Sequence, residues 1–305
     1  KTLYKLGCLK GVVDINENVL ANINKQFPNI KTYSNIDNAL NDNYEGFIVS
    51  TPAKSHYNIA SKIIKNRFPL LIEKPLALSL SESEKLIDLA DIYKTNVMVG
   101  HVLLFHPAIR KIKKIIESGD IGAIQYIYSN RLNLGQVRTE ENVFWSLAPH
   151  DISMFEFILN CNPSNVKAFG GEFIQEGIQD ITLSMFEYPK NIKAHIFVSW
   201  LHPFKEHRII IIGSKGMIRF EDSHQDKKIE LYNKNFNMID GKVIKNDGLS
   251  KLIDFNQTLP LDNELIYFMN YLDTSFEISN IYSGYNVVKI LSEISNQINT
   301  EVNIR

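Results

Sequence analysis

The stretch Leu70-Leu71-Ile72-Glu73-Lys74-Pro75 joins an apolar run to two charges and a proline. The apolar part is typical of a strand buried in a parallel sheet. In open α/β sheets, ligands bind beyond the carboxyl ends of the strands, which would place Glu73 and Lys74 beside a ligand. The alternative is a strand that ends at the surface with two solvated charges. On the tripeptide alone this second interpretation is favoured, because three residues recur easily by chance.

Short apolar strands alternate with helices on both sides of this stretch. We expect strands at residues 10–14, 46–51, 69–74 and 96–101, and helices at residues 2–6, 17–26, 54–65 and 107–118, with another after Ser81. This alternation predicts a parallel, doubly wound sheet of the α/β class, that is, a Rossmann-type domain.

The pattern changes after Gly122 to successive strands joined by short turns, which indicates an open, mostly antiparallel sheet in an α+β domain. We expect strands at 124–134, 166–174, 181–188, 192–200, 208–212, 217–221 and 229–232, helices at 149–160, 262–272 and 283–297, and irregular chain at 233–260. The predicted domains are residues 1–120 and 121–305.

The composition argues against several classes of function, namely nucleic-acid binding, membrane binding and metal binding. The 305 residues carry a formal net charge of −1, which gives no support for nucleic-acid or membrane binding. Cys8 and Cys161 are the only cysteines, so neither a disulfide framework nor a cysteine zinc site is available. The histidines show no ligand spacing, and we expect no metal. Without a signal peptide or a long apolar run, a cytoplasmic protein is expected.

Asp14 follows the first predicted strand. At the end of the second strand of a dinucleotide fold, an acid accepts hydrogen bonds from the ribose hydroxyls and repels a 2′-phosphate, which favours NAD over NADP. Capping of the next helix is an equally good interpretation. The glycine-rich phosphate loop should lie about 20 residues upstream, but only thirteen residues precede Asp14 and none forms that motif. We therefore expect the natural protein to carry a preceding strand and loop.

Two further segments carry polar residues at predicted strand or helix ends. Ser50, Thr51 and Pro52 follow a strand, and the helix after them would direct its N-terminus at negative charge. His56 either contacts a cofactor or is an exposed helix residue, and the second is favoured. Pro149 suits a first helical turn, which would put His150 at a helix start.

The roles of these and other polar residues have two interpretations each. His150 is a candidate proton-transfer group or a hydrogen-bonded histidine at a helix start. Asp151 is more typical of a structural acid at a helix end, where it favours the positive end of the helix dipole, than of a catalyst. Arg131 would hold a phosphate or carboxylate, or form an ordinary salt bridge. Trp200 would line a sugar site or pack a corner.

The order of these motifs resembles that of the glucose–fructose oxidoreductase/inositol dehydrogenase/MocA (Gfo/Idh/MocA) family. The motifs are Asp14, Thr51-Pro52-x-x-x-His56, Glu73-Lys74-Pro75, Gly100-His101 and Trp145-x-x-x-Pro149-His150-Asp151. The resemblance implies NAD(P)-linked oxidation or reduction of a sugar-like hydroxyl, with a C-terminal sheet that forms homo-dimers or homo-tetramers. It also implies a cis Lys74–Pro75 bond, with Lys74 as the catalytic lysine and His150 as the catalytic histidine.

Within the family, residues 128–135, 145–154 and 195–203 resemble the nucleotide-sugar branch. That branch implies oxidation at C3 of a UDP-N-acetylhexosamine or its uronate, for surface-polysaccharide or lipid A synthesis. A dehydrogenase or reductase of a free sugar or cyclitol, and a non-catalytic sensor, remain as alternatives. Many relatives have an Asp four residues before the catalytic histidine, whereas this chain has Ser146, so Lys74 would carry more of the proton transfer.

The resemblance completes the set of expected site residues. Those expected at the cofactor are Asp14, Ser50, Thr51, Pro52, His56, Glu73, Lys74 and His101. Those expected at the substrate are Lys74, Arg131, Asn133, His150 and Trp200.

Overall fold

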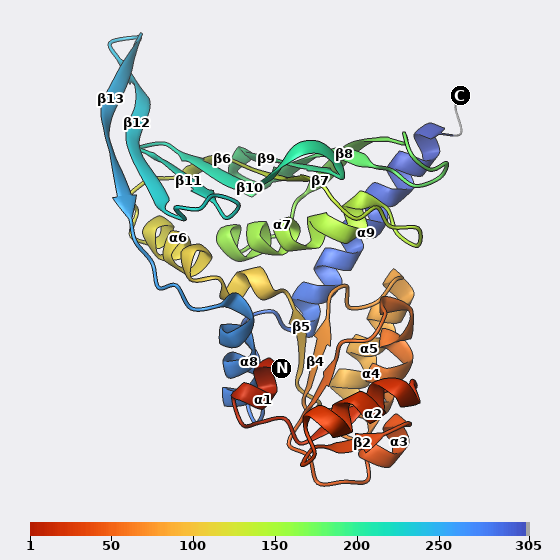
Figure 1. Ribbon diagram of the computed structural model, residues 1–305. Coiled ribbons are helices and arrows are strands. Elements are labelled where there is room, and N and C mark those ends of the chain that lie inside the picture. The colour runs from red at the N-terminus through yellow and green to blue at the C-terminus, as the bar shows by residue number, and fades with distance from the viewer. Residues whose placement is uncertain (303–305) are drawn as a thin grey trace. The chain divides into compact units, whose positions relative to one another are not determined.

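The computed structural model describes residues 1–302 and divides into two compact units (Figure 1). The first unit is Lys1–Gly100 with Leu261–Tyr285, and the second is His101–Pro260 with the chain from Asn286 onward. The predicted ranges, 1–120 and 121–305, differ from these units over residues 101–120 and 261–285. Residues 261–285 return to the first unit because the backbone N–H of Val99 donates to the Ser279 carbonyl at 2.7 Å.

The first unit consists of short parallel strands alternating with helices, as predicted. Its elements are α1 (Thr2–Lys5), β1 (Gly11–Val13), α2 (Glu17–Gln26), β2 (Lys31–Tyr33), α3 (Ile36–Ala39), β3 (Phe47–Val49), η1 (Ala53–Ser55), α4 (His56–Lys65), β4 (Leu70–Glu73), α5 (Leu80–Tyr93), β5 (Val97–Gly100) and α8 (Pro260–Asn270), followed by the start of α9 (Ile281–Val302).

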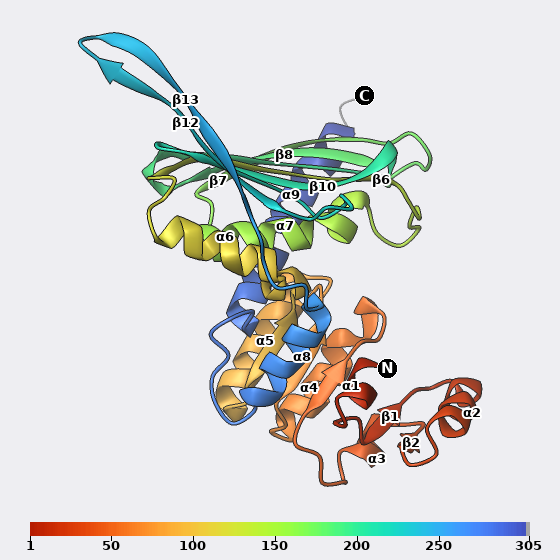
Figure 2. The same ribbon diagram turned by 60° about the vertical axis from the view of Figure 1, so that its left-hand side comes forward.

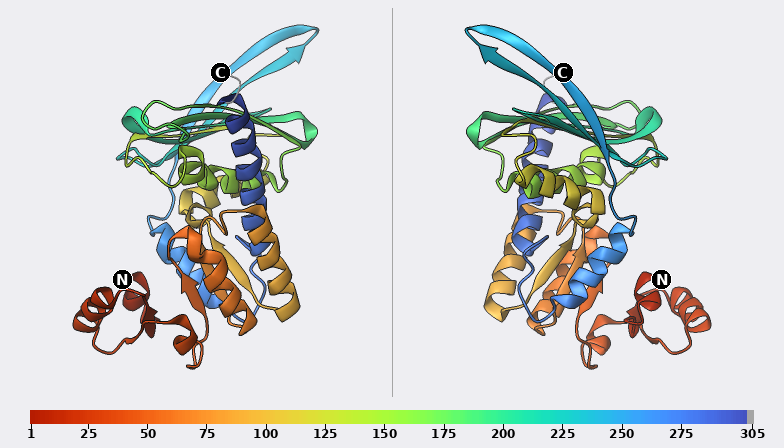
Figure 3. Two further views of the ribbon diagram at one scale, coloured as in Figure 1. Left: turned by 90° about the vertical axis from the view of Figure 1, so that its right-hand side faces the viewer. Right: turned by 90° about the vertical axis from the view of Figure 1, so that its left-hand side faces the viewer.

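These strands form two separate parallel sheets, β1–β2 and β3–β4–β5. Figure 3 shows the N-terminal elements, drawn in red, standing away from the β3–β4–β5 sheet. Helices α4 and α5 cover one face of that sheet and α8 the other (Figure 1). Because both faces are covered, Leu70, Leu71 and Ile72 are at most 3% exposed.

The second unit is built on an eight-stranded sheet. Its elements are η2 (Val102–Phe105), α6 (Pro107–Glu117), β6 (Ile124–Leu134), α7 (Val143–Leu159), β7 (Asn165–Gly171), β8 (Ile181–Tyr188), η3 (Pro189–Asn191), β9 (Ile192–Ser199), β10 (Leu201–Gly213), β11 (Met217–Glu221), β12 (Ile229–Ile239) and β13 (Lys242–Ile253), with the remainder of α9. The strand order is β13-β12-β11-β10-β6-β9-β8-β7. Every neighbouring pair is antiparallel except β6–β9, so the prediction of a mostly antiparallel sheet is confirmed.

Helices α6, α7 and α9 lie on one side of this sheet (Figures 1 and 2). Strand β8 shows the consequence, because Phe186 is buried against the helices while Leu183 and Met185 are 43% and 53% exposed on the opposite side. We call this opposite side the helix-free face. None of the helices within residues 1–302 is long and apolar enough to cross a membrane.

Two expectations about the second unit are wrong. Residues 233–253 are not irregular but belong to the β12–β13 hairpin, which turns at Asp240 and Gly241 with φ of 49° and 74°. Positive φ at both turn residues is typical of a tight hairpin. Helix α7 begins at Val143 rather than Pro149, because the Asn142 side chain accepts a hydrogen bond from the Trp145 N–H and caps it. Pro149 and His150 are therefore in mid-helix, and the helix-start argument for His150 does not hold.

Candidate active site

The carboxyl ends of β3, β4 and β5 bring several predicted residues to one edge of the first unit's sheet. Ser50 and Thr51 follow β3 and are exposed, whereas Lys74 follows β4 and His101 follows β5. Glu73 and Gly100 are paired neighbours across β4 and β5. A Cβ atom at residue 100 would lie 3.1 Å from Glu73 Oε2, so the glycine leaves room for that carboxylate at the strand end.

The His56 side chain is buried and contacts the backbone after two of these strands, β3 and β4. Its ring is 1% exposed, so the interpretation as an exposed helix residue is wrong. Nδ1 lies 2.8 Å from the Pro75 carbonyl and Nε2 lies 2.9 Å from the Thr51 carbonyl. Both ring nitrogens are thus occupied by backbone oxygens, and the imidazolium form, which has two N–H groups, can donate to both. His56 positions the segments around Thr51 and Pro75, and the Lys74–Pro75 bond is cis as the family resemblance implied.

Asp14 follows β1 and takes part in the turn before α2. Its Oδ1 accepts the backbone N–H of Asn16 at 2.8 Å, and Asn16 in turn caps α2 through its side chain. One carboxylate oxygen of Asp14 therefore accepts a hydrogen bond in the turn before α2. This role is similar to the capping interpretation, although the residue that caps the helix is Asn16. Its contact with a ribose remains a prediction.

Sequence reasoning did not find Glu264, which lies in the first turns of α8 and is 1% exposed. Burial, together with the nearby charge of Glu73, raises the pKa of Glu264 to about 8. Burial also raises the pKa of Glu73, against the opposing effects of the Lys74 backbone N–H and the Lys74 and His56 charges. Among the described residues, Glu264 Oε1 has no hydrogen-bond partner. Glu264 therefore holds its proton at neutral pH, and its carboxyl carries no charge next to Glu73.

The Glu264 carboxyl should make stability fall as pH rises. Between the unfolded pKa, near 4.3, and the folded value of about 8, the native state holds a proton that the unfolded state has lost. Stability is thus highest below this window and declines through it, by roughly 3 to 4 kcal/mol from about pH 5 to pH 8. In Glu264→Gln this decline should be largely absent, as measured by urea unfolding at both pH values with circular dichroism. Equal pH slopes in both proteins would contradict the assignment.

In the second unit, Arg131 of β6 and Asp151 of α7 form a buried two-pronged ion pair. Arg131 Nε lies 2.8 Å from Asp151 Oδ2, and a terminal guanidinium nitrogen lies 3.0 Å from Oδ1. The two residues are 7% and 1% exposed. Of the two interpretations of Arg131, this geometry matches the salt bridge. Asp151 was expected to be a helix-end acid, but it lies in the middle of α7.

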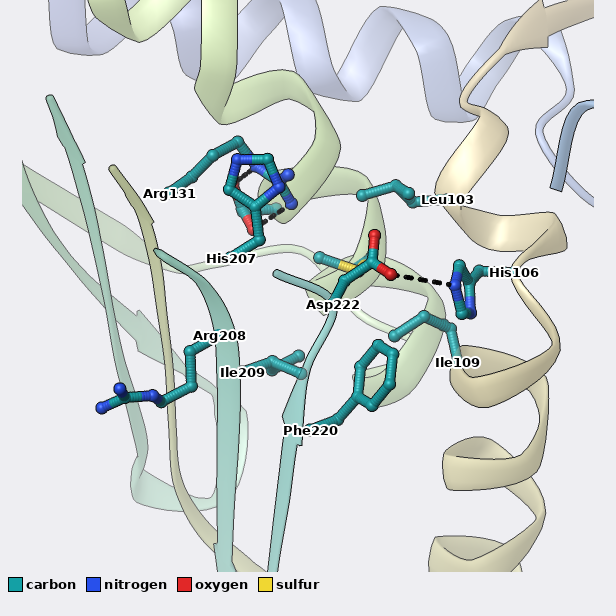
Figure 4. A pocket seen from close by; sticks show the side chains of 11 residues that line it. Leu103, His106, Ile109, Arg131, His207, Arg208, Ile209, Phe220 and Asp222 are labelled. Carbon is teal, nitrogen blue, oxygen red and sulfur yellow. Dashed lines mark hydrogen bonds and ion pairs between the residues drawn. The ribbon is translucent and has the colours of Figure 1, made fainter. Parts of the chain in front are cut away.

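A small pocket next to this pair is lined by residues of η2, α6, α7 and strands β6, β10 and β11 (Figure 4). His207 lies beside Arg131, and burial together with the Arg131 and Lys205 charges lowers the pKa of His207 to about 3. On the other side His106 Nε2 lies 3.5 Å from Asp222 Oδ1. The pocket thus has a neutral histidine next to an ion pair, and sequence reasoning did not anticipate it.

The remaining predicted substrate residues also lie in the second unit. His150 directly precedes Asp151, and Ser146 lies one turn earlier on the same face of α7. Asn133 is half-buried near the end of β6. Trp200 is 2% exposed between β9 and β10, which matches the packing interpretation.

Each unit therefore gathers its own part of the predicted site. In the first unit, Thr51, His56 and Glu73 lie around the strand end that is followed by Lys74. In the second unit, the Arg131–Asp151 ion pair links α7, the helix that carries His150, to strand β6. The pairing of Lys74 with His150 remains a prediction. Among the side chains that the structure describes, residues 1–298, His, Cys, Asp and Glu form no group of three or more suited to a metal ion.

Two family models match the chain. Residues 5–101 match the model described as "Oxidoreductase family, NAD-binding Rossmann fold", and residues 109–219 match the "GFO/IDH/MocA C-terminal domain". Together they cover about two thirds of the chain.

Curated relatives are similar at low identity. D-xylose 1-dehydrogenase [NADP(+)] of Haloarcula marismortui is 22% identical over 79% of this chain and 68% of its own length. UDP-N-acetylglucosamine 3-dehydrogenase of Acidithiobacillus ferrooxidans is 26% identical over 53% of this chain and 50% of its own length. The scyllo-inositol 2-dehydrogenase (NAD(+)) of Bacillus subtilis is 25% identical over 57% of this chain and 54% of its own length. The alignments thus span only about half the length of the last two.

A solved structure of the Acidithiobacillus ferrooxidans UDP-N-acetylglucosamine 3-dehydrogenase has the same fold. It superposes with a TM-score of 0.82 over 95% of this chain and 90% of that one, at 19% identity. The likeness extends over both units and concerns the fold alone.

Proposed function

The chain belongs to the Gfo/Idh/MocA family of oxidoreductases, and on that premise we propose that it oxidises the C3 hydroxyl of a UDP-N-acetylhexosamine or its uronate with NAD. The observation that carries this proposal is the position of Lys74, directly after a buried strand at the ligand-binding edge of a parallel sheet. The nucleotide-sugar motifs on β6, α7 and β9 support the substrate class, and we assign the reaction to surface-polysaccharide or lipid A synthesis.

The residues at the carboxyl ends of β3, β4 and β5 fit a nicotinamide cofactor. Exposed Ser50 and Thr51 offer hydroxyl groups beside α4, and Gly100 keeps the neighbouring strand end open. The nicotinamide supplies a hydride acceptor when it is bound. Asp14 favours NAD over NADP through its charge.

Lys74 and His150 together remove the proton of the sugar hydroxyl that is oxidised. A base must take the hydroxyl proton as the sugar carbon is oxidised, and a histidine changes its protonation near neutral pH. The Lys74 ammonium stabilises the developing alkoxide or takes the proton itself. With Ser146 in place of an acid, His150 has no carboxylate at that position to orient it, so Lys74 carries the larger share.

A substrate panel tests this function. The full-length protein is mixed with NAD or NADP and with UDP-N-acetylglucosamine, its uronate, free N-acetylglucosamine or an inositol, and reduced cofactor is followed by absorbance. We expect turnover with NAD and a UDP-sugar, and far less with NADP or a free sugar. Turnover of the inositol alone would refute the nucleotide-sugar assignment, and cofactor binding without any turnover would refute the enzyme.

One alternative function has an observation in its favour. The D-xylose relative aligns over a larger share of this chain than the nucleotide-sugar relative does. Oxidation of a free sugar or cyclitol is therefore the second candidate, and the same panel separates the two.

We also propose that the chain forms a homo-dimer or homo-tetramer through the helix-free face of its large sheet. This face exposes apolar side chains on β7 and β8, including Leu183 and Met185. Helices cover the other face and leave this one available.

A further inference from the structure

The Glu264 carboxyl is a buried acid to which the proposed reaction assigns no role. The residue lies on α8 and is 1% exposed. Among the side chains that the structure describes, its Oε1 has no hydrogen-bond partner. Buried polar atoms are nearly always hydrogen-bonded, because water no longer solvates them. An exception of this kind inside the first unit points to a role other than packing.

Helix α8 runs antiparallel to the strands that it covers (Figure 1). In its last turn, Phe268 lies 3.4 Å from the position that a Cβ atom would take at Gly46, just before β3. The Tyr271 carbonyl, just after the helix, accepts a hydrogen bond of 2.9 Å from the Asn96 side chain, just before β5. Both contacts are at the amino ends of strands. Glu264, in the earlier turns of α8, therefore lies toward the carboxyl ends, at the edge where ligands bind.

Glu73 is the charged group that faces Glu264 from the sheet. It is half-buried at the end of β4, and its charge adds to burial in raising the pKa of Glu264. The Lys74 backbone N–H and the Lys74 and His56 charges act in turn on Glu73. Strand β5 presents a glycine next to Glu73. On α8 itself, Asp262 lies two residues before Glu264 and so points to another side of the helix.

This arrangement links the Glu264 proton to Lys74. Two neighbouring carboxyls that are removed from water do not both ionise readily. While Glu264 holds its proton, the pair carries at most one negative charge. If Glu264 also ionises, the second charge repels Glu73 and stabilises the Lys74 ammonium, which makes Lys74 a weaker base.

We propose that Glu264 is a positioning residue that acts through Glu73: its uncharged carboxyl keeps Lys74 able to accept a proton, and loss of the Glu264 proton limits turnover on the alkaline side. The proposal rests on the function proposed above, in which Lys74 carries the larger share of the proton transfer. The pKa of Glu264, about 8, sets the pH at which this limit appears. Below that pH, turnover rises with pH because a base of the reaction loses its proton, and above it the rise ends.

The pH profile of kcat/KM tests the proposal, because this ratio reports the ionising groups of the free enzyme. The full-length protein is assayed with NAD and UDP-N-acetylglucosamine from about pH 6 to about pH 10. We expect the alkaline limit near pH 8 in the parent chain. In Glu264→Gln, which has the same shape but does not ionise, the limit should move up by at least ~1 pH unit. An unchanged limit in this variant would overturn the proposal.

Three further variants separate the charge of Glu264 from its packing. Glu264→Asp keeps an ionising group and should keep an alkaline limit. Glu264→Met, an apolar side chain of similar length, should lose the limit as Glu264→Gln does. Glu277→Gln removes an exposed acid from the same unit and should keep the parent profile. An alkaline limit that persists in Glu264→Met, or that disappears in Glu277→Gln, would show that the Glu264 charge does not cause it.

The reactivity of the Lys74 amine tests the same link without substrate or NAD. Acetic anhydride modifies only the uncharged amine, so the rate of modification, read by mass spectrometry of the digested chain, follows the pKa of Lys74. Exposed Lys65 is the internal reference. At about pH 7 the parent and Glu264→Gln should react equally. At about pH 9 Lys74 of the parent should react roughly threefold more slowly, because the Glu264 charge stabilises the ammonium.

The two measurements keep the inference apart from the proposed function. Equal Lys74 rates in the parent and Glu264→Gln at both pH values would overturn the link between Glu264 and Lys74, whatever the substrate panel shows. Rates that differ as expected, in a protein that turns over none of the sugars in the panel, would support the link and refute the proposed function.

Discussion

Replacing Lys74 with alanine is expected to lower turnover about 100- to 10,000-fold, the usual contribution of a general acid or base. The dissociation constant for NAD should change far less, because Lys74 acts on the hydroxyl that reacts rather than on the adenosine half of the cofactor. His150→Ala should have an effect in the same range, and smaller than that of Lys74→Ala, since Ser146 leaves His150 without the carboxylate found in many relatives. Initial rates with a UDP-sugar and NAD titration by fluorescence measure the two quantities.

Controls for these variants come from exposed residues of the same type. Lys65→Ala, at the end of α4, removes one lysine charge from the first unit, and His224→Ala removes an exposed histidine from the second. Both should keep ordinary turnover. Near-normal rates in Lys74→Ala and His150→Ala together would refute the catalytic assignment.

The strands of the first unit were predictable because burial on both faces leaves a continuous apolar run, as in Leu70–Ile72. Strand β2 (Lys31–Tyr33) was missed because it has three residues, none of them fully buried, and so carries no such run. The β12–β13 hairpin was missed for a related reason. Both of its faces are exposed over most of its length, so polar and apolar residues mix without the alternation of a half-buried strand.

One local signal for this hairpin was nevertheless present. Asp240-Gly241 between two strand-like runs is a strong indication of a tight hairpin. The boundary of α7 was missed through another local signal, since Pro149 was assigned to a first turn although Asn142 caps the helix. Predicting these two elements from the sequence therefore requires the turn and cap residues as well as the hydrophobic pattern.

The side-chain pairs of the site could not be predicted from one sequence. Glu264 approaches Glu73 only because α8 returns to the first unit after the whole second sheet. Lys74 was predicted at a strand end, His56 on the helix after another strand, and Arg131 on a strand of the second sheet. Their partners, the Pro75 and Thr51 carbonyls for His56 and the Asp151 carboxylate for Arg131, depend on tertiary packing.

The Arg131–Asp151 pair should be the most sensitive point of the second unit. Asp151→Ala leaves the Arg131 guanidinium buried without its counter-charge, and breaking a buried pair in this way costs about 3 to 5 kcal/mol. Replacing both residues by apolar ones, as in R131M/D151L, should recover much of that loss, because no uncompensated charge remains. Both tryptophans, Trp145 and Trp200, lie in the second unit, so urea unfolding followed by tryptophan fluorescence reports on it directly.

A surface pair supplies the contrast. Asp254 is 82% exposed at its side chain where it pairs with Lys228, so Asp254→Ala should cost about 1 kcal/mol or less. If Asp151→Ala were no more costly than this, the buried pair would not hold α7 to β6. Because His150 adjoins Asp151 on α7, Asp151→Ala should also lower turnover in the fraction of molecules that remain folded. The double variant restores stability without restoring the charged link, so recovery of folding without recovery of turnover would identify the pair as a positioning device for His150.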